Sequence, residues 1–338
     1  MRRIILAIIF ILFAGSTFCQ NPQFSQYYAS PLLIAPSFAG NSLGSRAYLS
    51  YRDQWAKLPG SFVTYSFALD NNFYAINSGM GLVVMRDVIG MVQLGTTSAK
   101  GLYSYRFNIN DDWRIRPGIS FSYTQRAMRN DKAIYPDMIW ITGIDANTIE
   151  QPVKPYYYYD ASSSIVLYNR RMWFGLCADN LLRPNDSFLR LNSRLPIQWS
   201  QFGGINFPLA NQVGKVPEVI TLNYLFKTTL NYSQLDIGLN WYRAPLLLGF
   251  AWRGLPSVKD KYHSYDALIF TVGVAFNDMA FGYSYDFTVS KLGPVTGGSH
   301  EITFTISFNE GNKPQRHGAI PCPDVVKFKM FGDKESFR

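Results

Sequence analysis

The sequence predicts an all-β protein: a transmembrane antiparallel β-barrel of about 14 strands, with an N-terminal signal peptide and a short periplasmic C-terminal tail. Three observations lead to this prediction. No stretch beyond the first twenty residues approaches the roughly 18 consecutive apolar residues that a membrane-spanning helix requires. Apolar and polar residues instead alternate with a period of two. Aromatic residues make up 16% of the chain and charged residues 16%, whereas about 25% is usual for charged residues.

The first residues have the layout of a signal peptide. Arg2 and Arg3 precede an apolar run from Ile4 to Ala14, and small residues lead to a cleavage site expected before Gln20. Four regions are therefore expected. They are a signal peptide (1–19), an N-terminal periplasmic or plug-like segment (20–43), an outer-membrane β-barrel (44–308) and a periplasmic tail (309–338).

The strands are predicted from the alternation. In 280–290, Phe281, Tyr283 and Tyr285 fall on one face, whereas Gly282 and Ser284 fall on the other. An aromatic face opposite a face of small, polar residues favours a membrane barrel. In a soluble sandwich the polar face already meets water, so it has less reason to carry so many Gly and Ser residues. The predicted strands are 44–53, 61–70, 78–85, 97–109, 113–124, 156–168, 171–181, 197–207, 217–227, 230–241, 245–254, 263–275, 278–289 and 299–308.

The connections between these strands are of two kinds. Tight turns such as Asn110–Asp112 and Asn169–Arg170 alternate with longer loops, led by Gln125–Pro155 and Leu182–Pro196. Short periplasmic turns and long outer loops are typical of outer-membrane barrels. An even strand number places both chain ends on the periplasmic side.

Charges within the strands lie on the polar face, so the side chains should point into the lumen. A charge on the lipid face would cost roughly 2–4 kcal/mol at the bilayer midplane. The mixed signs predict an interior joined by ion pairs rather than a ring of one sign. The candidate lumen charges are Arg52, Asp70, Lys100, Arg106, Arg114, Arg116, Asp160, Asp236 and Asp286.

Several functions are disfavoured. The three histidines have no partner at metal-ligand spacing, and neither a cofactor nor a catalytic residue is expected. The cluster of Asp260, His263 and Asp266 lacks a nucleophile with a base at a defined spacing. The net charge of +9 is scattered, so nucleic acid is not an expected partner. No small-molecule substrate is expected either, and outer-membrane lipid should surround the barrel.

Two further features have alternative interpretations. The run from Tyr156 to Tyr159 fits an aromatic girdle at the membrane boundary better than a platform for a ligand. Cys177 and Cys322 are far apart in sequence, and are interpreted as two unrelated thiols rather than one long-range disulfide.

An ordered set of motifs covers most of the first 110 residues. Its residues are Gln23, Phe24, Gln26, Tyr27, Pro31, Pro36, Gly40, Arg52, Gln54, Trp55, Pro59, Gly60, Gly79, Gly81, Asp87, Gly90 and Tyr103–Arg106. This set resembles the PorP/SprF family of Bacteroidetes outer-membrane proteins, and the tail element Pro321-Cys322-Pro323 resembles that of some members. Ala35 is a departure, because members usually carry Asn before the proline. Most of the motif residues are interpreted as structural or plug residues, with Arg52 able to pair with a lumen carboxylate such as Asp70.

The resemblance implies a non-enzymatic component of type IX secretion or gliding motility. Its expected partners are the C-terminal domain of a secreted cargo protein or adhesin and other secretion components. The candidate contact regions are the loop Gln125–Pro155 and the segment Phe24–Gly40. Alternatives are a passive channel or hydrophobic-solute transporter, a rim enzyme, and a tail that docks to the periplasmic machinery. An open, conducting lumen would favour the channel, and Ser, Asp and His converging at the outer rim would favour the enzyme.

Overall fold

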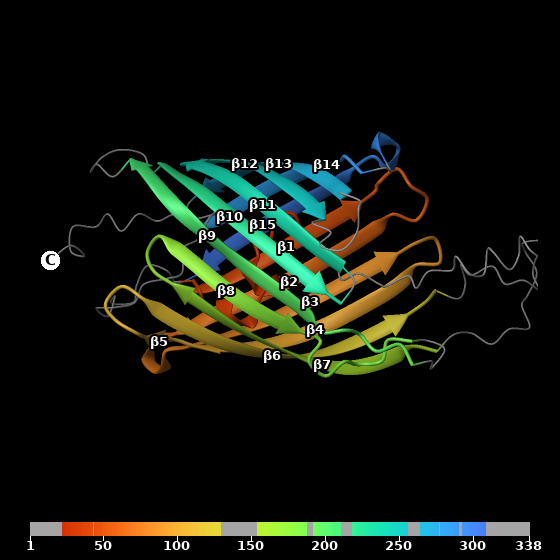
Figure 1. Cartoon of the computed structure of the whole chain (residues 1–338), viewed down its shortest axis with the longest axis horizontal. Helices are drawn as coiled ribbons and strands as arrows, with labels where there is room; N and C mark the ends of the chain where they lie inside the picture. Colours follow the sequence, from red (N-terminus) through yellow and green to blue (C-terminus); the bar gives the residue numbers. More distant parts are fainter. Residues whose placement is uncertain are drawn as a thin grey trace, which may run out of the picture.

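The strands of the computed structural model form one closed antiparallel barrel, whose strands cross its long axis obliquely (Figure 1). The structure describes residues 22–42, 44–129, 154–187, 192–210, 218–230, 232–255, 264–276, 278–290 and 293–308. The strands are β1 (Ser45–Gln54), β2 (Phe62–Phe73), β3 (Ser78–Ile89), β4 (Leu94–Tyr105), β5 (Phe107–Asn108), β6 (Arg114–Ala127), β7 (Tyr156–Tyr168), β8 (Met172–Asp179), β9 (Gln198–Ala210), β10 (Glu218–Thr229), β11 (Tyr232–Arg243), β12 (Leu246–Leu255), β13 (Ser264–Phe276), β14 (Met279–Thr288) and β15 (Ser299–Phe308).

Closure involves the first and last strands. Apart from β4 and β5, neighbouring strands in the sequence pair with each other. β1 pairs with β15, and β4 pairs with β6, whose first residues also pair with the two-residue β5. The wall thus has 14 strands plus the short β5, which confirms the predicted barrel. The predicted strand 97–109 is wrong in one respect, because it ends at Tyr105 and β5 follows after Arg106. The amide of Arg106 donates to the carbonyl of Asn77 at 2.8 Å, which continues the β3–β4 pairing by one step beyond Ser78↔Tyr105.

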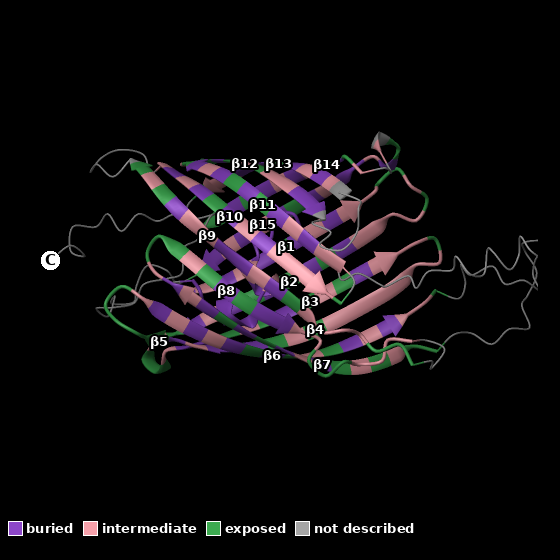
Figure 2. Cartoon of the chain, in the orientation of Figure 1, coloured by how far each residue is buried: buried purple, intermediate pink, exposed green. Residues whose placement is uncertain are grey.

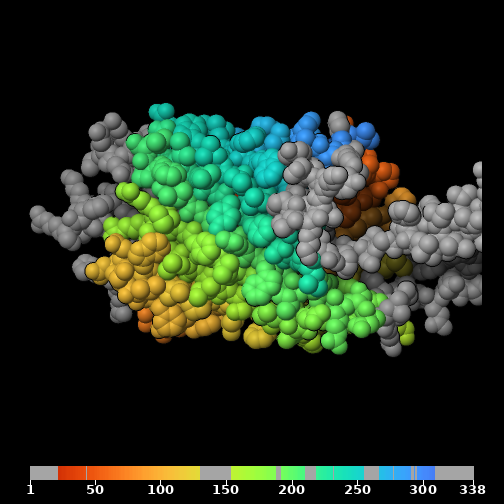
Figure 3. All heavy atoms as spheres, viewed as in Figure 1, coloured from red at the N-terminus to blue at the C-terminus, as the bar shows by residue number. Residues whose placement is uncertain are grey.

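The burial pattern is the reverse of that of a soluble protein. On β2, Thr64 and Asp70 are 4% and 1% exposed, whereas the intervening Tyr65 and Phe67 are 51% and 38% exposed. Figure 2 shows the same alternation of buried and more exposed residues along the wall strands. The outer side chains pack into a continuous surface on the face seen in Figure 3, which is the surface that lipid would cover. No helix in the described part of the chain is long and apolar enough to cross a membrane.

The two ends of the barrel differ in their connections. We call the end that holds Ser45 and Phe308 the turn end, and the end that holds Gln54 and Ser299 the loop end. Connections at the turn end include the 3-10 helix η3 (Tyr74–Ile76) and the turn between β7 and β8. The loop end includes the stretch between β8 and β9 and the 3-10 helix η5 (Pro294–Thr296).

Candidate functional site in the barrel lumen

The lumen is occupied by the chain's own N-terminal segment, residues 22–42, which we call the plug. Two 3-10 helices, η1 (Pro31–Leu33) and η2 (Pro36–Phe38), each begin with a proline, whose fixed φ suits the first helical position. Leu32, Ala35 and Ala39 are no more than 2% exposed. The described residues of the segment 20–43, for which a periplasmic or plug-like position was expected, therefore lie within the barrel. They run inside the wall, because polar lumen side chains satisfy their backbone groups.

A group of five charged residues, the loop-end ion network, lies beside the start of the plug. Arg52 contacts Asp286 at 2.7 Å and Glu301 at 3.0 Å, and Arg253 contacts Asp286 at 3.1 Å and Asp236 at 3.2 Å. All five side chains are nearly inaccessible to solvent. Two cations and three carboxylates leave one negative charge in excess, so the network needs further donors.

The plug supplies those donors. The backbone amides of Ser25 and Gln26 donate to the two oxygens of Glu301, at 2.7 and 2.9 Å. The Ser25 hydroxyl donates to Asp286 at 2.6 Å and accepts from Arg52 and Arg253. Ser25 therefore lies at the centre of a charge-assisted hydrogen-bond network, which is the strong kind.

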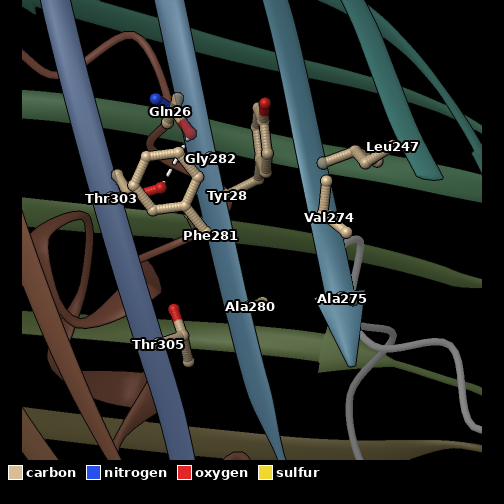
Figure 4. A pocket seen from close by; sticks show the side chains of 11 residues that line it. Gln26, Tyr28, Leu247, Val274, Ala275, Ala280, Phe281, Gly282, Thr303 and Thr305 are labelled. Carbon is tan, nitrogen blue, oxygen red and sulfur yellow. Dashed lines mark hydrogen bonds between the residues drawn. The ribbon is translucent and has the colours of Figure 1, made fainter. Parts of the chain in front are cut away.

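Further plug side chains bind the wall at this level. The Gln23 amide donates to Asp236 at 3.0 Å. The side-chain amide of Gln26 lies between the hydroxyls of Ser284 and Thr303. It also faces Gly282, where a Cβ atom would lie 2.3 Å from the Gln26 side-chain oxygen (Figure 4). Tyr27 donates to Asn223 at 2.5 Å. Phe24 is 7% exposed.

The plug is held differently near the turn end, where glycines leave room for its backbone. A Cβ on Gly79 would lie 2.1 Å from the Ala39 oxygen, and one on Gly118 would lie 2.4 Å from the Ser37 nitrogen. Gly40 has φ +66, which glycine adopts readily, and it abuts Gly79. The Ala39 carbonyl accepts bonds from Ser104 at 2.7 Å and Arg116 at 3.3 Å.

The turn-end half of the lumen is rich in arginine. Arg46, Arg106 and Arg116 lie over the rings of Tyr48, Tyr74 and Tyr168, with 5.7–5.9 Å from guanidinium carbon to ring centroid. Such cation–π contacts accommodate buried arginines where carboxylates are scarce. Arg114 is also buried and donates to the Asp111 carbonyl at 2.9 Å.

All the candidate lumen charges thus lie inside the wall, but the ion pairs differ from the one expected. Arg52 pairs with Asp286 and Glu301, not with Asp70, whose register partner is Arg46. Lys100 lies 3.7 Å from Asp179. The Asp160 carboxylate accepts a bond from the Leu182 amide at 3.2 Å.

The remaining motif residues shape the first connection at the loop end. Trp55 follows β1 with φ 60 and packs edge-on against Phe62, and its amide donates to Gly298 at 2.8 Å. Gln54 is the register partner of Phe62. Gly60, with φ +79, packs closely against Gly90 and Met91, and Pro59 is exposed.

Sequence reasoning missed Arg46, Arg126, Arg253, Glu301 and Ser25 as lumen residues. The alternation signal was present, since Glu301 precedes Ile302 on the polar face and Arg253 follows Trp252. Ser25 had no such signal, because it lies outside any strand. Arg126 donates to the Asp186 side chain at the loop end.

No group of three His, Cys, Asp or Glu side chains among the described residues is arranged to hold a metal ion. Cys177 is a buried free thiol. Some predictions concern residues outside the described part of the chain: residues 1–19, Asp260, His263, Cys322, the tail 309–338 and most of the loop Gln125–Pro155.

The fold and the lipid-facing surface define an integral outer-membrane β-barrel with an occupied lumen. The family model of the type IX secretion system membrane protein PorP/SprF matches residues 16–306, and the chain belongs to this family. The search of curated proteins finds no significant match.

Solved structures with a similar fold are distant in sequence. The toluene transporter TbuX of Ralstonia pickettii shares 10% identity, with 83% of this chain and 94% of that chain covered and a TM-score of 0.48. The monoaromatic hydrocarbon channel CymD also shares 10% identity, over 83% and 93% of the two chains, with a TM-score of 0.46. The outer membrane protein Omp33 of Acinetobacter baumannii shares 8%, over 79% and 99%, with a TM-score of 0.43.

Proposed function

We propose that the protein is a non-enzymatic outer-membrane component of the type IX secretion or gliding system that helps to export a secreted, adhesin-like cargo protein or anchor it at the cell surface. Its partners would be the C-terminal domain of that cargo and other secretion components. The observation that carries the proposal is the plug. Because the chain's own buried segment fills the lumen, the loops and rims remain as the surfaces available to bind a partner.

The small size of two cavities beside the plug, both lined by described residues, supports a binding role over a passive channel. The cavity beside Gln26 and Tyr28 measures about 10 Å³ (Figure 4), and the one beside Tyr27, Phe38 and Trp173 about 30 Å³. A water molecule needs about 10–15 Å³ on this measure, so each of these spaces suits about one to three waters rather than a hydrocarbon.

We place the loop end outside the cell and the turn end at the periplasm, following the rule that barrels have short periplasmic turns and longer outer loops. The cargo would then meet the loop end. The segment Phe24–Gly40, expected as a contact region, is not available for this role, since most of it is buried in the lumen.

The experiment is deletion of the gene followed by mass spectrometry of surface-labelled proteins. We expect one large cargo to disappear from the surface while other secreted proteins still leave the cell. Re-expression of the chain in the deletion strain is the control and should restore display. Normal display of every cargo in the deletion strain would contradict the proposal, and steady conductance of the purified protein in planar bilayers would favour a channel.

A further inference from the structure

One wall strand continues beyond its neighbour at the loop end. β7 pairs with β6 over its whole length, from Arg114↔Tyr168 to Arg126↔Tyr156. Its pairing with β8 covers only Ser163↔Ala178 to Tyr168↔Trp173, followed by one bond from the Leu181 amide to the Ala161 carbonyl at 2.9 Å. Residues 156–160 of β7 therefore have a strand on one side alone within the described part of the chain.

The orientation of the open edge follows from that last bond. The Ala161 carbonyl points toward the β8 side, and backbone groups of alternate residues in an antiparallel strand point the same way. The N–H and C=O groups of Tyr157 and Tyr159 thus face the open side. Among the described residues, no hydrogen bond reaches these groups. We call residues 156–160 the open β7 edge.

The height of this edge places it at the outer boundary of the membrane. At a rise of about 3.3 Å per residue and a tilt of about 40°, Tyr159 lies about 23 Å above Tyr168 along the barrel axis, close to the top of an apolar band about 25 Å tall. Hydrocarbon does not tolerate unpaired backbone groups. Since no described residue pairs with its open side, the open β7 edge must meet head groups, water or a further protein segment.

The edge has a rigid aromatic face and basic neighbours. Tyr123 stacks on Tyr157 at 5.8 Å between centroids, with the planes 10° apart, and also contacts Tyr159 at 5.2 Å. The stretch that follows β8 carries Arg183, and Arg194 pairs with Asn185 of the same stretch in an isolated antiparallel bridge. Both arginines are exposed. Arg126 engages the nearby Asp186 carboxylate.

We propose that the open β7 edge receives an extended, acidic segment of the secreted cargo by strand addition, in the place that a longer β8 would fill. Main-chain hydrogen bonds to Tyr157 and Tyr159 would provide the binding, as in other cases of strand addition. The basic neighbours would favour an acidic sequence, because charge complementarity selects partners. This inference rests on the proposed function and specifies its contact surface.

The test compares Tyr159→Pro with Tyr159→Ala in cells. Proline removes the edge-facing N–H and is tolerated at strand edges, whereas alanine removes the ring and keeps the N–H. The cargo is the protein that gene deletion removes from the surface. We expect Tyr159→Pro to lower its display by about tenfold, the effect of losing about 1.4 kcal/mol of binding, and Tyr159→Ala to lower it far less. Heat-modifiable gel mobility checks that both barrels fold.

The outcomes separate this inference from the proposed function. Loss of no cargo on deletion overturns both. Loss of the cargo on deletion, with normal display in a folded Tyr159→Pro variant, overturns the strand addition alone. Equal losses of display in the proline and alanine variants would assign the effect to the tyrosine ring. Cross-linking of a Tyr159→Cys variant between two copies of the chain would assign the edge to self-association. Either outcome would contradict the inference.

A second arm of the same experiment tests the charge of the partner. Arg183→Glu combined with Arg194→Glu should reduce cargo display, while Arg170→Glu with Arg171→Glu, which reverses two exposed arginines at the turn end, should not. Equal display in the two double variants would contradict the acidic character of the added segment.

Discussion

The two halves of the lumen hold the same plug by different means. At the loop end, an ion network of two arginines and three carboxylates encloses the backbone of Ser25 and Gln26. The backbone amides of these two plug residues donate hydrogen bonds to Glu301. At the turn end, Gly79 and Gly118 let the plug backbone touch the wall, and arginines lie on aromatic rings. Polar complementarity holds the first half, and close fit holds the second.

This comparison predicts the largest effect at the loop end. Arg253→Met should lower the free energy of unfolding by about 3–5 kcal/mol, because it leaves Asp236 and part of Asp286 as uncompensated buried charges. Urea titration of the detergent-refolded barrel, followed by tryptophan fluorescence, measures the change. Arg243→Met, an exposed arginine at the turn end of β11, is the control. Equal stability of the two variants would mean that the network contributes little.

A smaller effect is expected from a change of fit at the turn end. Gly79→Ala places a methyl group against the Ala39 carbonyl, and overpacking of this kind costs about 1–3 kcal/mol. Gly101→Ala is the matched control, because a Cβ there meets nothing within 4 Å. The same titration applies, and protease sensitivity of the plug should rise in the first variant alone. A plug that stays resistant in both would indicate that the glycine contact is not needed.

The smallest effect is expected midway between the two halves. Tyr27→Phe removes the bond to Asn223, which sits outside the ion network, and the net loss should be about 1 kcal/mol. A loss as large as that of Arg253→Met would show that the two halves are coupled through Tyr27 and would remove the distinction drawn between them.

The sequence predicts the barrel well because alternation reports directly on which face of a strand meets lipid. The same signal places Arg52 and Asp70 inside. It does not report, however, how far along the barrel axis each charge lies. Arg52 is the register partner of Glu301 and Arg46 that of Asp70, six residues nearer the turn end. The pairing of Arg52 with Asp286 and Glu301 depends on closure between β1 and β15, which no local pattern encodes.

The plug and the open β7 edge illustrate two further limits. Residues 22–42 form no strand, so neither periodicity nor charge indicates that Ser25 reaches the centre of the ion network. Prolines and Gly40 indicate an irregular segment, but not where it lies. The open edge depends on the unequal lengths of β7 and β8, which appear only once the register between them is known.

The contacts of Ser25 also constrain how the molecule assembles. This residue precedes every strand, yet it bonds Asp286 and Glu301 on β14 and β15, which are 261 and 276 residues later in the chain. Contacts across such separations form slowly, because most of the chain must be ordered first. Since the plug bonds the last two strands, we expect the first described residues and those strands to come together as the wall closes. Insertion of the barrel into the membrane and filling of its lumen would then be one event.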